Sequence, residues 1–133
     1  MNKIFLIITI FICSYAHATQ KYYIYVIELK KEVLKEKKFL KENPEHNPEK
    51  PCVYVGYSSK TPEKRFEEHL SGARNKKGRL FNKYAKKYGI RLKPRLYKIH
   101  NPFESKEEAM KMEEEKARRL RKRGYAVWQK WLN

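Results

Sequence analysis

Three observations predict that the chain is a small α/β domain of the α+β type. Two segments dense in aromatic and β-branched residues, 22–29 and 52–57, have the composition of strands. Helical periodicity recurs between and after them, most clearly beyond Ser105. If the apolar N-terminal stretch is removed after Ala18, residues 19–133 remain, which is enough for a single domain.

The N-terminal segment, residues 1–18, is typical of a secretion signal. Lys3 supplies a positive charge, residues 4–12 are almost all apolar, and residues 16–18 read Ala-His-Ala, a small-x-small cleavage site. The apolar run is shorter than the roughly 20 residues that a membrane-spanning helix needs. We therefore expect export to the periplasm or the exterior, with no stable membrane association after cleavage. An uncleaved N-terminal membrane anchor is the alternative.

The first strand is expected at residues 22–29, and residues 52–57 form its natural partner. Between them, residues 31–42 have helical character but a thin apolar stripe, and a proline-containing loop follows. This charged insertion, about residues 30–51, either shapes substrate access or is a solvated arm. Only Cys52 remains after cleavage of the signal, so no intramolecular disulfide can form.

A helix is expected to begin after the second strand. Thr61 followed by Pro62 is a favoured order for a helix start. Arg65 and His69 are four residues apart and therefore lie together on one face of this helix. The following segment, residues 71–78, is expected to be flexible and basic.

Three further elements complete the expected domain. Residues 79–88 have helical periodicity, and Gly89 is expected to cap that helix at its C-terminus. Residues 95–100 alternate as a third strand would. Ser105 and Glu108 then form a capping box at the start of the last helix.

The last helix carries three consecutive glutamates, of which only one is expected to face the core. At about 100° per residue, Glu113 falls about 40° from Ala109, within the apolar stripe, whereas Glu114 and Glu115 fall about 140° and 240° away. A carboxylate in that position is costly unless it is paired or binds a metal. Glu113 is therefore a candidate metal ligand, and a buried salt bridge, for example to Arg65, is the structural alternative.

The charge of the chain favours an anionic partner. There are 32 Lys and Arg residues against 15 acidic residues, all of them Glu, and the formal net charge is +17. Such an excess favours binding to polyanions, nucleic acid above all. Secreted antimicrobial, heparin-binding and membrane-surface proteins share this property, so the motifs must decide between these classes.

Two strand motifs, Ile24-Tyr25 and Tyr54-Val55-Gly56, precede the helix positions Arg65, His69 and Glu113. In identity and order, these residues resemble the GIY-YIG nuclease superfamily. The resemblance spans residues 22 to about 128, and signatures beginning at Pro51 and Gly124 resemble a small bacterial branch of the superfamily.

The resemblance implies a three-stranded antiparallel sheet flanked by helices, in an endonuclease that hydrolyses phosphodiester bonds with one divalent cation, Mg²⁺ or another such as Mn²⁺. It implies a nucleic-acid substrate, DNA in preference to RNA. The implied catalytic residues are Tyr25, Tyr54, Arg65, His69 as an accessory, and Glu113 as the metal ligand. The expected substrate-binding residues are Gly56, Arg65, Arg74, Lys76 and Lys77.

The chemistry requires such a set. Charge gathers on the phosphate oxygens in the transition state, and a metal on Glu113 and the guanidinium of Arg65 neutralise it from two sides. A tyrosine has an ordinary pKa of about 10 and is a poor base at neutral pH. Tyr25, Tyr54 or a water molecule beside the metal takes the proton from the attacking water, and the sequence does not choose between them.

Each candidate residue also has a purely structural interpretation. Tyr25 and Tyr54 fit as core aromatics, and Arg65 with His69 fits as a solvated helix face. Tyr23 stands where the family has its name-giving glycine, and the late asparagine of many relatives has no evident counterpart near residues 124–128. The alternative function is therefore a catalytically inactive basic module of the same fold that binds nucleic acid or another polyanion.

Overall fold

A computed structural model describes residues 19–129, so the expected secretion signal lies outside the described residues. A four-stranded sheet in the order β3-β1-β2-β4 forms its centre. The strands are β1 (Tyr23–Leu29), β2 (Cys52–Ser58), β3 (Gly89–Leu92) and β4 (Ala126–Gln129). β1 is antiparallel to β2 and β3, whereas β4 runs parallel to β2.

The α+β class is confirmed, but the expectation of three antiparallel strands is corrected to a mixed sheet of four. The additional strand, β4, has four described residues and begins two residues after Gly124, which leaves too short a run for alternation to be recognised. It matters for the site because it pairs with residues 52–55 of β2 and places Gln129 beside Val55.

The third strand was expected at residues 95–100 and lies earlier in the chain. Residues 95–100 instead fall in two short 3₁₀ turns, Pro94–Leu96 and Lys98–His100. Pro94 has no backbone N–H to donate to a neighbouring strand, which favours a turn there. The strand begins at Gly89, which also caps α3 as expected by donating its backbone N–H to the Ala85 carbonyl, but in an extended rather than a left-handed conformation.

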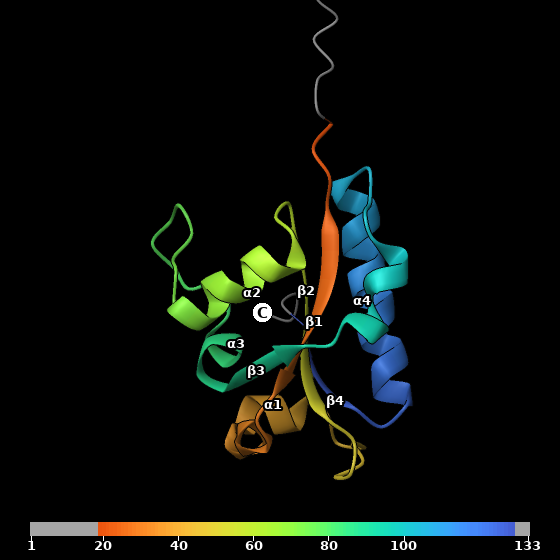
Figure 1. Cartoon of the computed structure of the whole chain (residues 1–133). Coiled ribbons are helices and arrows are strands. Elements are labelled where there is room, and N and C mark those ends of the chain that lie inside the picture. The colour runs from red at the N-terminus through yellow and green to blue at the C-terminus, as the bar shows by residue number, and fades with distance from the viewer. Residues whose placement is uncertain (1–18, 130–133) are drawn as a thin grey trace, which may run out of the picture.

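The helices lie on both sides of the sheet (Figure 1). α2 (Pro62–Ser71) and α3 (Lys83–Tyr88) are on one side of β1, and α4 (Lys106–Lys122) is on the other. The expected caps are confirmed, because Thr61 accepts from the backbone N–H of Lys64 and Ser105 from that of Glu108.

The helix expected at residues 79–88 is shorter than its apolar periodicity indicated. The side-chain oxygen of Asn82 accepts from the backbone N–H groups of Tyr84 and Ala85, both at 2.9 Å. This cap starts α3 at Lys83 and leaves Phe81 in the preceding loop, where it is available to the site.

The insertion between β1 and β2 packs into the core. Its short helices, η1 (Lys31–Lys35) and α1 (Lys37–Lys41), bury Val33 and Phe39 completely. The buried amide of Asn43 then pairs with β4 as a strand would, donating to the Val127 carbonyl at 3.0 Å and accepting from the Val127 N–H at 2.7 Å. The insertion is therefore not a solvated arm.

Asn101 satisfies the edge of β1 in the same way. It accepts from the backbone N–H of Ile24 at 2.9 Å and donates to the carbonyl of Ile24 at 2.8 Å. Two asparagine amides thus satisfy strand edges that would otherwise be open to pairing with another chain.

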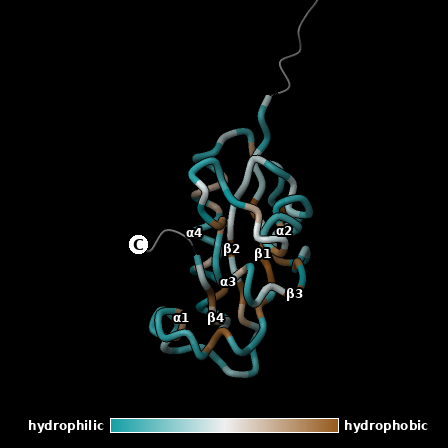
Figure 2. Tube along the Cα trace, turned by 90° about the vertical axis from the view of Figure 1, so that its left-hand side faces the viewer, coloured by the Kyte–Doolittle hydropathy of each residue, from teal (hydrophilic) through white to brown (hydrophobic). Residues whose placement is uncertain are grey.

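Apolar segments gather along the central strands, while the surrounding helices and loops are mostly hydrophilic (Figure 2). Cys52 is buried in this core, and burial raises the pKa of its thiol, so a structural role suits it better than a reactive one. Within residues 19–129, no helix has the length and apolar character needed to cross a membrane.

Candidate active site

β1 and β2 bring Tyr25, Tyr54 and Gly56 to one face of the sheet. Tyr25 pairs with Gly56, and Ile27 pairs with Tyr54, so all four side-chain positions point to the same side. Both tyrosines are 2% exposed, and their ring centroids are 6.0 Å apart.

Gly56 leaves the space that the tyrosine pair occupies. A Cβ atom there would lie 2.6 Å from the Tyr25 hydroxyl oxygen and 2.9 Å from a ring carbon of Tyr54. Any side chain at this position would displace both tyrosines. The packing of the two tyrosines therefore explains why glycine occupies position 56, without any contact with a substrate.

α2 adds His69 behind the tyrosine pair. The Tyr25 hydroxyl is hydrogen-bonded to His69 Nε2 at 2.8 Å, and the His69 ring meets the Tyr54 ring edge-on at a centroid distance of 5.4 Å. His69 is 2% exposed, so it acts on other groups through Tyr25 more readily than through solvent.

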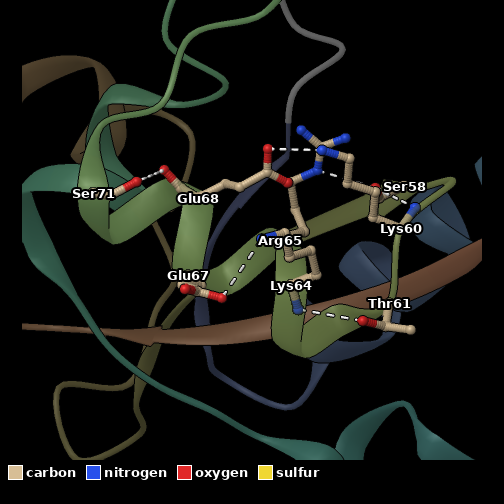
Figure 3. A network of polar contacts seen from close by, with 8 residues as sticks. All are labelled: Ser58, Lys60, Thr61, Lys64, Arg65, Glu67, Glu68 and Ser71. Carbon is tan, nitrogen blue, oxygen red and sulfur yellow. Dashed lines mark hydrogen bonds and ion pairs between the residues drawn. The ribbon is translucent and has the colours of Figure 1, made fainter.

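Arg65, one turn earlier on α2, is fixed on two sides. Its Nε donates to Ser58 Oγ at 3.0 Å, and its guanidinium carbon lies 3.8 Å from the centroid of the Phe81 ring. Figure 3 shows Arg65 reaching back to Ser58 within the polar contacts of α2. Arg65 Nη1 is buried without a hydrogen-bond partner. Because an unpaired buried donor is costly, this atom is suited to an anionic oxygen.

Glu113 approaches from α4 with its carboxylate buried. It is 1% exposed, whereas Glu114 is exposed and Glu115 partly so, which confirms the orientation expected from helical phase. Gln129, on β4, donates from its amide Nε2 to Glu113 Oε1 at 3.1 Å. This hydrogen bond orients the Glu113 carboxylate, and its donor comes from a strand that was not predicted from the sequence.

Four of the five candidate catalytic residues line one recess of about 440 Å³. His69 is not at its wall but lies behind Tyr25. The recess therefore joins groups from both sides of the sheet. Its walls are formed by Gln20, Tyr22, Tyr25, Tyr54, Tyr57, Ser58, Ser59, Arg65, Asn75, Phe81, Lys106 and Glu113.

The basic loop after α2, residues 72–78, lies beside this recess, and its three cations do not share one environment. Arg74 Nη1 donates to the carbonyl of Gly78 at 2.9 Å and so braces the loop. Lys76 and Lys77 line a neighbouring recess of about 430 Å³, which meets the first at Asn75. Of the three expected cations, the two lysines are therefore better placed to contact a partner.

Burial controls the protonation of the two tyrosines. It raises the pKa of Tyr25 well above the ordinary value, and it raises that of Tyr54 as well. Arg65 lowers both pKa values and Glu113 raises both, but these effects are smaller than that of burial. Both hydroxyls are accordingly protonated at neutral pH.

The residues at the recess fit a hard divalent cation. A buried carboxylate at the wall of a polar recess is the kind of ligand that Mg²⁺ and Mn²⁺ prefer, and Mg²⁺ is commonly held by one or two carboxylates together with substrate phosphate and water. Among the described residues there is no group of three or more His, Cys, Asp or Glu side chains able to hold a metal. A metal at this site would therefore depend on Glu113 and on the substrate.

The model of the GIY-YIG catalytic domain matches residues 21–126. The chain belongs to the GIY-YIG family. Searches of curated proteins and of solved structures gave no match. The GIY-YIG domain has a nuclease-type fold that indicates a nucleic-acid substrate, and nucleases of the family generally use a divalent metal. The matched residues include Tyr25, Tyr54, Arg65, His69 and Glu113.

Two contributors to this GIY-YIG site were missed from the sequence. Gln129 lies three residues beyond the family match, and its only signal was a polar side chain after the apolar run that ends at Trp128. Phe81 was assigned to the apolar stripe of a helix, so its position over Arg65 was not expected. Tyr23, which stands where the family has its name-giving glycine, is accommodated without burial, since it is partly exposed near the end of the sheet, opposite Ser58.

Proposed function

We propose that this GIY-YIG protein is an exported endonuclease that hydrolyses phosphodiester bonds in nucleic acid, DNA in preference to RNA, with one Mg²⁺ or Mn²⁺ held by Glu113. One observation carries the proposal. A single recess is lined by Arg65, whose Nη1 is buried without a hydrogen-bond partner, by the buried Glu113, and by Tyr25 and Tyr54. These are the groups needed to bind a phosphate, to neutralise the charge that develops on it and to transfer a proton.

Arg65 supplies the fixed positive charge of the proposed site. Ser58 and Phe81 hold its guanidinium in place, so little reorganisation is needed when negative charge develops on a phosphate oxygen. When bound, the divalent cation supplies Lewis-acid polarisation of the same phosphate from the side of Glu113. Gln129 keeps the Glu113 carboxylate oriented through the hydrogen bond to Oε1.

The contact with His69 favours Tyr25 over Tyr54 as the proton acceptor for the attacking water. As the water oxygen bonds to phosphorus and the bond to the leaving oxygen breaks, Tyr25 takes the water proton and passes its own to His69 Nε2, which requires the tautomer with its proton on Nδ1, and the leaving oxygen takes a proton from solvent. The negative charge of phenolate, which burial disfavours, then does not build up on Tyr25. Activity lost more completely in Tyr54→Phe than in Tyr25→Phe would assign the base to Tyr54 instead.

Metal removal tests the proposed activity directly. Purified residues 19–133 should nick plasmid and cut single-stranded DNA with Mg²⁺, lose this activity in excess EDTA, and regain it when Mg²⁺ or Mn²⁺ is restored. RNA of matched length should be cut more slowly. Salt-sensitive binding without cleavage under any divalent metal would instead identify an inactive basic module of this fold.

Export is a separate part of the proposal and rests on residues 1–18 of the sequence. Cleavage after Ala18 makes Thr19 the first residue of the mature protein. N-terminal sequencing of the protein isolated from its native cells checks this. Intact Met1 in the membrane fraction would show an anchor instead.

A further inference from the structure

The recess is larger than a phosphate group requires. Its volume of about 440 Å³ lies within the roughly 300 to 1,000 Å³ in which proteins bind whole small molecules. Arg65 and Glu113 account for only part of its wall. Tyr25, Tyr54, Ser58 and Phe81 also take part in the proposed hydrolysis, but Gln20, Tyr22, Tyr57, Ser59, Asn75 and Lys106 do not.

Three partly exposed aromatic rings line the recess. Tyr57 pairs with Ile24 in the sheet, and Tyr22 is two residues before Ile24, so Tyr22 and Tyr57 share one face. Phe81 comes from the loop before α3, on the side of Arg65. Aromatic rings thus reach the recess from both sides of the sheet, and such rings are the surfaces on which proteins stack nucleobases.

Cationic and polar groups accompany these rings. Lys106, in the first turn of α4, lines the same recess, as do Ser59 and Gln20. A cation beside aromatic rings at the wall of one recess matches the alternation of phosphate and base along a strand. A base within a matched duplex has both faces covered by its neighbours and cannot present one to a tyrosine.

We propose that this recess binds one whole unpaired nucleotide beside the cleaved bond, with its base stacked on Tyr57 and Tyr22 and a flanking phosphate at Lys106. The proposal rests on the nuclease function proposed above and specifies its substrate class. The site then takes nucleotides from single strands, or bases extruded from a duplex, in preference to paired bases. The rings, rather than hydrogen-bond readout, provide the affinity, so base preference should be low.

Binding measured without cleavage tests this subsite. The Glu113→Gln chain is titrated against a short single strand that carries 2-aminopurine, whose fluorescence falls when it stacks on an aromatic ring. We expect clear quenching, and about ten-fold or greater loss of affinity in Tyr57→Leu and in Tyr22→Leu. Tyr57→Phe keeps the ring and should bind as before. Tyr23→Leu changes the adjacent tyrosine, which does not line the recess, and should also bind as before.

Comparing single-stranded, matched and bulged substrates distinguishes a base taken from a single strand from a base extruded from a duplex. A matched duplex should bind more weakly than the single strand and add no quenching, whereas a duplex with one bulged 2-aminopurine should be quenched if extrusion suffices. Equal affinity for matched duplex and single strand, or unchanged quenching in both leucine variants with native thermal unfolding, would overturn the subsite. Cleavage that prefers matched duplex would overturn the subsite alone. Quenching without cleavage in the wild-type chain would refute the nuclease and leave the subsite intact.

Discussion

Replacing Glu113 by Gln should lower phosphodiester cleavage by about 10³-fold while leaving the fold intact. The substitution keeps the shape of the side chain and an oxygen that can accept from Gln129, but it removes the charge that a divalent cation requires. Because catalysis by a metal ion contributes several kcal/mol to such reactions, its loss has this scale. Single-turnover cleavage with saturating Mg²⁺ measures the effect on the chemical step.

The matched control for this experiment is Glu114→Gln. Glu114 is adjacent on α4 and exposed, and the change alters the net charge equally. It should leave the cleavage rate within about two-fold, since surface substitutions away from special features have small effects. Retention of Mg²⁺-dependent cleavage within ten-fold in Glu113→Gln would remove Glu113 as the metal ligand.

Thermal unfolding gives a readout of the metal that does not depend on activity. A cation that binds only the folded chain raises the Tm of the wild-type protein as its concentration rises. This rise should be absent in Glu113→Gln. The Tm of that variant without metal should stay close to the wild-type value, because the substitution keeps the shape of the side chain and an oxygen that can accept from Gln129.

The sequence predicted the parts of the site that depend on local periodicity. Helical phase selected Glu113 from three adjacent glutamates, and spacing placed Arg65 and His69 on one face of α2. The resemblance to the family supplied the two strands and the order of the motifs. These predictions succeed because a helix or a paired strand fixes side-chain direction within a few residues.

The parts that failed depend on contacts between distant segments. β4 is defined by pairing with β2, and Gln129 acquires its role from that pairing and from α4. Residues 95–100 have the alternation of a strand, but residues 89–92 pair with β1 instead, and Pro94 begins a 3₁₀ turn. Phe81 was misplaced because the cap at Asn82 outweighed apolar periodicity.

Arg65→Ala should reduce kcat by about 10³-fold with a smaller change in KM. The guanidinium is held by Ser58 and Phe81 before any substrate arrives, so its contribution is realised mainly as charge develops in the transition state. The neighbouring substitution Lys64→Ala removes an equal charge from an exposed position on the same helix, where the Lys64 ammonium makes a long contact with Glu67 at 3.9 Å. It should leave kcat nearly unchanged.

Arg65→Lys separates the geometry of the guanidinium from its charge. Lysine retains the positive charge, but its three donors sit on a single nitrogen, so it lacks the planar fork in which Nε binds Ser58 while Nη1 lies at a fixed distance from it. We expect it to recover only part of the activity, leaving kcat about 10- to 10²-fold below the wild-type value. Full recovery by lysine would mean that a point charge suffices, and the buried Nη1 of Arg65 would then have no special part in the reaction.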